Sequence, residues 1–301
     1  MNGILEAGIE NILWLQQFQT DRSYFFWDVF TNFGGSYYLY MVPALLWSVD
    51  YRMGLRLLLL LTATLILNSI LKEAFAAPRP FELDARIVSS GEIGYGLPSG
   101  HAQLAVVFWG VLADWIDRKP FWILAFAMMF LMGLSRLVLG VHFPTDVLAG
   151  WFLGGVTLWL YRLYRAEGEA WLGALSRGRQ LGLVTLASAG AFLATQVVAR
   201  ELNVPGAGAA GFVLGGGFGA VLGLHLLGFR GDGPVWQRGA RFLIGIPVLL
   251  LFLVLVGQAG IPEGWMGMPV VALELTILGS FLAAGGPWLF QLLRLSSRPG
   301  F

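Results

Sequence analysis

The sequence contains no cysteine and little charge. Without cysteine, the chain has no disulfides, no catalytic thiolate and no cysteine-ligated metal. Only 12% of its 301 residues are charged, the net charge is +1, and the basic residues are spread along the chain instead of forming a patch. This distribution gives no support to nucleic-acid binding, and no nucleic-acid partner is expected. Histidine is scarce as well, with three residues, so the position of each one is informative.

Apolar residues dominate what is present. They make up 57% of the chain, and the mean hydropathy is +0.71. Many runs reach roughly 20 residues, enough to cross a hydrocarbon core about 30 Å thick. Stretches such as 57–71 and 249–256 lack the polar face that the outer helices of a soluble protein need. We therefore predict an all-α, polytopic transmembrane helix bundle. About nine spans are expected, at 31–49, 55–72, 100–116, 121–141, 145–164, 180–199, 206–228, 240–258 and 269–292.

The segment before the first span has a different pattern. Between residues 3 and 19, apolar residues such as Ile9 alternate with polar ones such as Glu6 and Glu10. This pattern predicts an amphipathic helix that lies in the membrane interface. No basic segment followed by an apolar core and a small-residue cleavage site is seen, so no removable signal peptide is expected. The predicted divisions are an interfacial helix (1–22), a core (23–165) and additional transmembrane helices (166–301).

The distribution of lysine and arginine predicts the orientation. With nine spans, 13 of these residues fall in loops on one side and six on the other. Because positively charged loops stay in the cytoplasm, we expect the first side and the C-terminus to face the cytoplasm. We expect an integral, multi-pass protein of a bacterial inner membrane.

Three short polar segments stand at the ends of predicted spans. They are Lys72 with Arg79-Pro80, then Pro98-Ser99-Gly100-His101, then Ser135-Arg136 with His142 and Asp146. The alternation of antiparallel spans puts all these ends on the less basic, non-cytoplasmic side. We therefore expect three cations, two histidines and one carboxylate to converge where the helices meet water.

These residue types suit a phosphate group. A phosphoester carries negative charge on its non-bridging oxygens, and that charge must be held through the transition state. Lys72, Arg79 and Arg136 supply cations, and an arginine offers a planar fork that matches phosphate geometry. Ser99 and Gly100 come at the start of a predicted helix, where backbone N–H groups can bind an anion. The sequence therefore predicts a phosphate-binding site.

With their spacing, the three segments read K-x6-R-P, P-S-G-H and S-R-x5-H-x3-D. In this order they resemble the signature of the type 2 phosphatidic acid phosphatase superfamily, which includes integral membrane lipid phosphatases and soluble vanadium haloperoxidases. The resemblance implies that His142 attacks phosphorus to form a phosphohistidine and that Asp146 holds its other ring nitrogen. It also implies that His101 protonates the leaving group, and that no metal or other cofactor takes part.

The expected activity is hydrolysis of a lipid or isoprenoid phosphate or diphosphate at the periplasmic or extracellular face. Candidate substrates are phosphatidic acid, phosphatidylglycerol phosphate, undecaprenyl diphosphate and a sphingoid-base phosphate. Membrane lipids are the other expected partners. Three alternatives stay open: a phosphotransferase that uses the same histidine, a phosphatase of soluble sugar phosphates, and, from a different class, a transporter or channel.

Other polar residues receive structural interpretations. Arg86 and Glu92, in the loop between the second and third spans, could contact a lipid headgroup, but we interpret them as solvated loop charges. His225 and Glu274 lie in apolar runs, and we expect each to make a helix-capping or interhelical hydrogen bond. The glycine-rich stretch 206–228 predicts close helix packing, within the monomer or across a homodimer. Residues 166–301 contain no motif that we can interpret.

Overall fold

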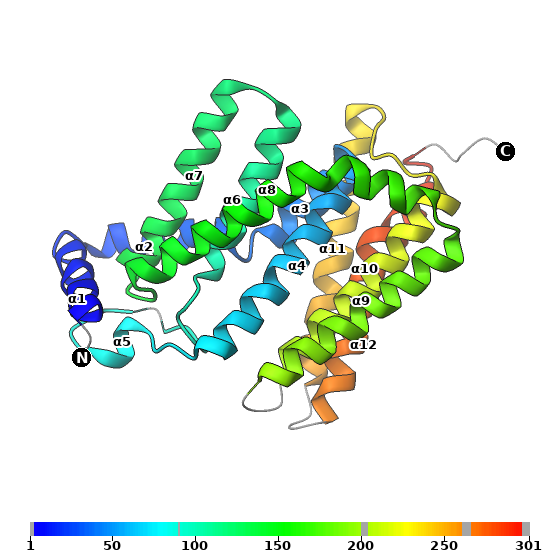
Figure 1. Cartoon of the computed structure of the whole chain (residues 1–301). Helices are drawn as coiled ribbons and strands as arrows, with labels where there is room; N and C mark the ends of the chain where they lie inside the picture. The colour runs from blue at the N-terminus through cyan, green and yellow to red at the C-terminus, as the bar shows by residue number, and fades with distance from the viewer. Residues whose placement is uncertain (1–2, 90, 200–203, 261–265, 297–301) are drawn as a thin grey trace. The chain divides into compact units, whose positions relative to one another are not determined.

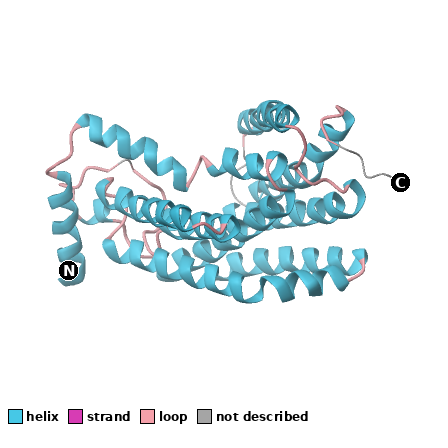
Figure 2. Cartoon of the chain, turned by 90° about the horizontal axis from the view of Figure 1, so that it is seen from above, coloured by secondary structure: helices cyan, strands magenta, loops and turns pink. Residues whose placement is uncertain are grey.

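The computed structural model describes residues 3–89, 91–199, 204–260 and 266–296; Arg200 and Arg298, which contributed to the charge count, lie outside them. In these ranges all regular structure is helical, and no strand is present (Figure 2). The all-α prediction is therefore confirmed. The chain divides into two compact units, Met1–Tyr38 with Leu67–Arg165, and Leu39–Ile66 with Ala166–Phe301.

The first unit carries all three polar motifs. It contains α1 (Gly3–Gln16), α2 (Asp21–Thr31), η1 (Asn32–Gly34), the end of α4 (Tyr51–Phe75), α5 (Pro80–Leu83), α6 (Gly100–Ile116), α7 (Lys119–Val138) and most of α8 (Pro144–Ala174). Helices α6 and α7 lie side by side (Figure 1).

Helix α6 is the central helix of this unit. Its residues from Ala102 to Ala113 are all buried, so it has no continuous lipid-facing side. Helix α8 packs closely against the beginning of α6, because two glycines lie on the face of α8 that contacts it. A methyl group on Gly150 would lie 2.5 Å from the Ser99 carbonyl oxygen, and one on Gly154 would lie 2.8 Å from the Gln103 carbonyl oxygen. Small residues four apart allow this close backbone contact.

Helix α1 forms where the amphipathic helix is predicted. Its apolar residues Ile9 and Ile12 are buried, and they pack with Ile87 and Phe143. The side chain of Gln16 donates hydrogen bonds to the backbone carbonyls of Val88 (2.7 Å) and Val138 (3.0 Å). Helix α1 therefore holds the loop after α5 and the end of α7. Its location in the membrane interface stays a prediction.

The second unit packs around α10. It contains α3 (Tyr38–Ser48), the beginning of α4, the end of α8, α9 (Arg177–Val198), α10 (Val204–Leu222), η2 (Gly223–Leu227), α11 (Val235–Ala259), α12 (Gly267–Ser280), η4 (Phe281–Gly285) and α13 (Gly286–Leu292). Helix α10 lies against α9 and α12 (Figure 1). Methyl groups on Gly211 and Gly215 would collide with backbone atoms of α12. The glycine-rich stretch therefore serves packing within the monomer.

The interpretation of His225 is confirmed. Its Nε2 atom lies 2.9 Å from Gln180 Oε1, which makes the expected interhelical hydrogen bond within the second unit. Glu274 has no comparable contact with the described part of the chain, and its expected hydrogen bond stays a prediction.

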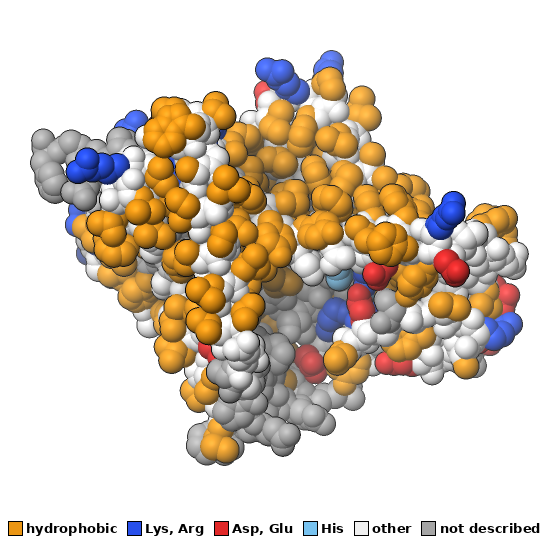
Figure 3. Space-filling view, turned by 180° about the vertical axis from the view of Figure 1, so that it is seen from behind, with side chains coloured by type: hydrophobic (Ala, Val, Ile, Leu, Met, Phe, Trp, Pro, Cys, Tyr) orange, Lys and Arg blue, Asp and Glu red, His pale blue; other side chains and the backbone are white. Residues whose placement is uncertain are grey.

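Six segments of the described chain are long and apolar enough to cross a membrane. They are Tyr51–Leu83, Lys119–Val138, Arg177–Val198, Gly206–Leu227, Val235–Gln258 and Gly267–Leu292. Apolar side chains also cover much of the described surface on the face drawn in Figure 3. The predicted spans 31–49, 100–116 and 145–164 are not among the six. Two of them correspond to short helices, α3 with 11 residues and α6 with 17. The count of nine stays a prediction.

Candidate active site

The end of α7 fixes Arg136 relative to His142. The helix stops because Gly140 adopts a left-handed conformation with φ of +67°, which favours glycine. A side chain there would also collide with Ile87 and Val88. After this turn, the backbone N–H groups of Val141 and His142 both donate to the Arg136 carbonyl, at 3.2 and 3.3 Å. Local backbone structure thus explains why five residues separate the arginine from the histidine.

Asp146 orients the His142 ring. Helix α8 begins at Pro144, and Asp146 in its first turn accepts a 2.9 Å hydrogen bond from the Phe143 backbone N–H. The same oxygen, Oδ2, lies 3.3 Å from His142 Nδ1. Because the carboxylate faces Nδ1, we assign the proton to that nitrogen and the lone pair to Nε2. The i, i+4 relationship predicted from the sequence is therefore present.

The lone-pair nitrogen of His142 points toward Arg79. Nε2 lies 3.4 Å from Arg79 Nη1. Burial lowers the pKa of His142 well below its usual value, and the nearby charges of Arg136, Lys72, Arg79 and His101 act in the same direction. The imidazole is consequently neutral near pH 7, which is the state a nucleophilic nitrogen requires.

A backbone hydrogen bond joins the second motif, Pro98-Ser99-Gly100-His101, to the third, which contains Asp146. The Ser99 backbone N–H donates a 3.0 Å hydrogen bond to the Asp146 carbonyl. That N–H group is therefore not available to an anion, in contrast to the expectation from the sequence. The Ser99 hydroxyl is buried and has no hydrogen-bond partner among the described residues, so it is the free polar group of this residue. Gly100 begins α6, as predicted.

Asn68 supports the same turn, and sequence reasoning missed it. Its Nδ2 atom donates to the Pro98 carbonyl at 3.2 Å and to Gln103 Oε1 at 2.9 Å. A methyl group on Gly100 would lie 3.1 Å from Asn68 Oδ1. Asn68 lies one helical turn before Lys72, and this position on an apolar helix is the signal that could have identified it.

Arg79 and Lys72 are held by backbone carbonyls of the loop after α5, and Arg79 also by one carbonyl after α7. Arg79 donates to Gly94 (2.7 Å), to Ile93 (3.3 Å) and to Val141 (2.9 Å). Lys72 donates to the carbonyls of Tyr95 and Gly96. These bonds satisfy much of each cation's donor capacity and aim both side chains at the same loop.

Arg136 is held by a residue outside the motifs. It is 1% exposed, and its Nη1 atom donates to the Thr31 hydroxyl at the end of α2. A buried guanidinium is costly unless its charge and its donors are both matched. Thr31 falls inside a predicted span, and nothing in the sequence indicated that its hydroxyl would bind Arg136.

Glu92 binds between the two arginines. Its Oε2 atom lies 3.0 Å from Arg79 Nη1 and 3.9 Å from His142 Nε2, and its Oε1 atom pairs with Arg136 Nη2. The Glu92 side chain is 29% exposed. The interpretation of Glu92 as a solvated loop charge is therefore wrong. Arg86, by contrast, is exposed and pairs with Asp84 and Glu10.

His101 follows Gly100 in the first turn of α6 and is half-buried. A methyl group on Gly35 would lie 2.7 Å from His101 Nε2, so the imidazole rests against the turn after η1. The structure thus gathers the predicted site residues in one unit and adds Asn68, Thr31 and Glu92.

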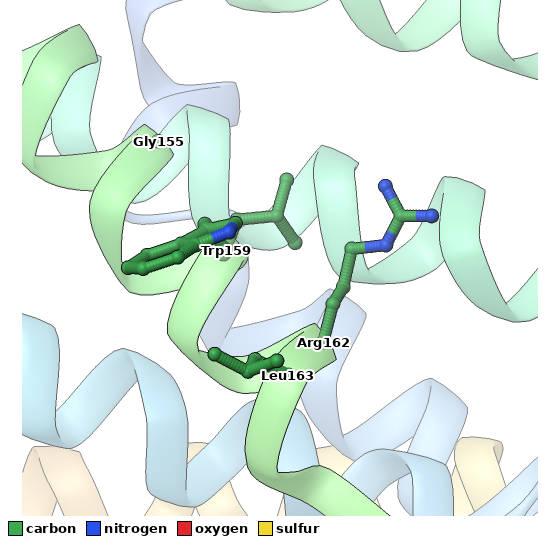
Figure 4. Close-up of a pocket in the computed structure, with 5 residues that line it drawn as sticks. Gly155, Trp159, Arg162 and Leu163 are labelled. Carbon is green, nitrogen blue, oxygen red and sulfur yellow. The ribbon is translucent and has the colours of Figure 1, made fainter.

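An open groove of about 500 Å³ lies elsewhere, along α8 (Figure 4). It is lined by Gly155, Leu158, Trp159, Arg162 and Leu163. Arg162 pairs with Asp114 at 3.1 Å. None of the lining residues belongs to the motifs, and the groove holds a single ionisable side chain. We therefore do not assign it to the phosphate chemistry.

Two family profiles match this sequence, and one of them covers the three motifs. The PAP2 superfamily profile matches residues 53–171, which include all three motifs. A second profile, for a transmembrane extension of PAP2 superfamily phosphatases, matches residues 207–298. Together they cover well over half of the chain, which belongs to the PAP2 superfamily, the type 2 phosphatidic acid phosphatases. With its long apolar helices, the chain is an integral membrane protein with several spans.

Similar proteins have named activities. The undecaprenyl-diphosphatase of Sulfolobus acidocaldarius is 32% identical over 128 residues, which cover 41% of this chain and 62% of the relative. Phosphatidylglycerophosphatase B of Bacillus subtilis is 35% identical over 118 residues, covering 36% of this chain and 56% of the relative. The chain thus spans less than two thirds of either relative. The crystal structure of a transmembrane PAP2-type phosphatidylglycerolphosphate phosphatase from Bacillus subtilis matches with a TM-score of 0.48 and 24% identity, over 56% of this chain and 88% of that one.

Proposed function

We propose that the protein is a membrane lipid phosphatase that hydrolyses a lipid or isoprenoid phosphate or diphosphate through a phosphohistidine. One observation carries this proposal: Asp146 holds Nδ1 of a buried, neutral His142, and Nε2 faces an anion position between Arg79 and Arg136. The substrate class follows from the family and from the named activities of the relatives.

In the first step, the lone pair on His142 Nε2 attacks phosphorus, and the bond from phosphorus to the leaving oxygen breaks. The negative charge of the bound phosphate favours the protonated form of His101, which gives its proton to that oxygen, so the leaving group departs as a neutral alcohol or as a protonated lipid phosphate. Arg79, Arg136 and Lys72 hold the charge on the non-bridging oxygens. Asp146 stabilises the positive charge that develops on the imidazole.

In the second step, neutral His101 accepts a proton from water as the water oxygen attacks phosphorus. The bond between phosphorus and Nε2 breaks, and its electron pair returns to the imidazole. Inorganic phosphate is released and both histidines return to their starting states. No step requires a metal. In the described part of the chain, no three His, Asp or Glu side chains form a metal-binding group.

The membrane arrangement belongs to the same proposal. We infer nine spans, an interfacial N-terminal helix, a cytoplasmic C-terminus and a site at the non-cytoplasmic face of a bacterial inner membrane. The 13 to six division of basic residues supports this orientation. The three divisions 1–22, 23–165 and 166–301 and a homodimer remain proposals as well.

The test is phosphate release in detergent, with EDTA present, from phosphatidic acid, phosphatidylglycerol phosphate, undecaprenyl diphosphate and sphingosine 1-phosphate. We expect at least one substrate to be hydrolysed, and His142→Ala to abolish both turnover and acid-labile labelling of the protein by a 32P-labelled substrate. Complete dependence on an added divalent metal would contradict the mechanism. Transfer to a supplied acceptor alcohol in place of water would identify the phosphotransferase instead.

A further inference from the structure

The anion position of the site is already occupied by a side chain of the protein. The two carboxylate oxygens of Glu92 contact two different guanidinium groups, those of Arg79 and Arg136. One of these oxygens also lies 3.9 Å from His142 Nε2. An anion that bridges both arginines and faces the nucleophilic nitrogen occupies the position that the substrate phosphate requires. The carboxylate and the phosphate therefore cannot bind there together.

The charges explain why the resting site needs an anion. Arg79 and Arg136 bring two buried positive charges, with Lys72 beside them, whereas Asp146 is already committed to His142. Glu82 and Asp28 also act on Arg79 and Arg136, but no ion pair within 4 Å joins them among the described residues. Arg79 and Arg136 are 3% and 1% exposed, so water cannot compensate them. A buried charge without a counter-ion is strongly destabilising. Glu92 supplies the counter-ion while the substrate is absent.

The segment that carries Glu92 can release it. Gly91 and Gly94, on either side of Glu92 and Ile93, have φ of +70° and +83°, and a methyl group on either would contact no atom within 4 Å. Arg79 holds this segment through the Ile93 and Gly94 carbonyls, which do not involve the Glu92 side chain. Because the side chain is partly exposed, it can turn into solvent without breaking these bonds.

We infer that Glu92 is an internal competitor of the substrate, which occupies the phosphate position of the resting enzyme and must be displaced before a phosphate can bind. The inference rests on the proposed function in one respect, namely that the displacing group is a phosphate. An internal ligand weakens the binding of every phosphate-containing ligand by the same factor. The apparent affinity is the intrinsic affinity multiplied by the fraction of molecules in which the site is free.

The experiment measures binding of inorganic phosphate and orthovanadate by calorimetry, and hydrolysis of the best substrate, for wild type and Glu92→Gln. We expect phosphate and orthovanadate to bind about tenfold more tightly to the variant, as for a site that is free about a tenth of the time. We also expect KM and the inhibition constant of phosphate to fall by the same factor, with little change in kcat. Without ligand, the variant should unfold at a lower temperature, and phosphate should restore its stability.

Asp84→Asn is the matched control, since it removes one negative charge from the same loop at a residue that pairs with Arg86. Asp84→Asn should leave the affinities for inorganic phosphate and for orthovanadate unchanged. If Glu92→Gln does not fold, Glu92→Asp tests the same point, because the shorter side chain cannot bridge both arginines as well. Unchanged phosphate affinity in the folded Gln or Asp variant, or a loss of kcat with unchanged affinity, would overturn the inference. Phosphate binding requires no turnover, so tighter binding would support it even if the proposed hydrolysis failed.

Discussion

The backbone N–H of Ser99 donates a hydrogen bond of 3.0 Å to the backbone carbonyl of Asp146. This bond joins the beginning of α6 to the first turn of α8, and therefore the second motif to the third. It is possible because Gly150, one turn further along α8, lets the two backbones approach. The relative position of His101 and the His142–Asp146 pair thus depends on a glycine that takes no part in the chemistry.

Gly150→Ala should therefore damage both stability and activity. The added methyl group would lie 2.5 Å from the Ser99 carbonyl oxygen, and a backbone atom cannot move aside as a flexible side chain can. We expect a loss of about 1–3 kcal/mol in stability, read as a lower unfolding temperature in detergent, and a lower kcat. Gly155→Ala on the same helix is the control, because a methyl group there meets no atom within 4 Å. That variant should keep wild-type stability or gain slightly. Equal behaviour of the two variants would contradict this account of the packing.

Asp146→Asn should reduce kcat by about 10²–10⁴-fold with little change in KM. The neutral amide can still accept the Phe143 N–H, but it cannot stabilise positive charge on the His142 ring or enforce the same tautomer. Asp146 does not face the anion position, so substrate affinity should remain. Steady-state kinetics on the best substrate, together with the amount of phosphoenzyme trapped by acid, separate the two effects. A defect confined to KM would show that Asp146 serves binding instead.

His101→Ala should affect substrates according to their leaving groups. A lipid monoester expels an alkoxide, which needs a proton, and loss of a general acid typically costs roughly 10²–10⁴-fold in rate. A lipid diphosphate expels a lipid phosphate, which is a better leaving group than an alkoxide, so its hydrolysis should fall less. The measurement compares kcat/KM of the variant for phosphatidic acid and undecaprenyl diphosphate. Equal losses for both substrates would argue against the acid role of His101.

The helices and the motif residues could be predicted from the sequence because both depend on local patterns. Apolar runs specify helices, and a spacing of four residues across the predicted start of a helix brings His142 and Asp146 close together. Thr31 and Glu92 could not be predicted. Arg136, the partner that they share, lies 105 residues from Thr31 and 44 from Glu92, and no periodicity specifies the path of the loop that carries Glu92. The count of nine spans also goes beyond what length and composition establish, since α6 is buried among other helices instead of facing lipid.

The protonation of His142 offers a test that requires no substrate. Because burial lowers its pKa in the folded protein, an unfolded chain takes up a proton on His142 below about pH 6.5 and the folded protein does not. This difference makes the folded state less stable as the pH falls, by up to about 1.4 kcal/mol per pH unit below 6.5, until the folded pKa is reached. In 13C-labelled protein, the His142 ring signal should keep its neutral position from pH 7.5 to 5.5, and His142→Gln should lose part of the fall in unfolding temperature over that range. Titration of the His142 signal near pH 6.5 would show that the ring is solvated, and the counter-ion position beside Arg79 would then need a different explanation.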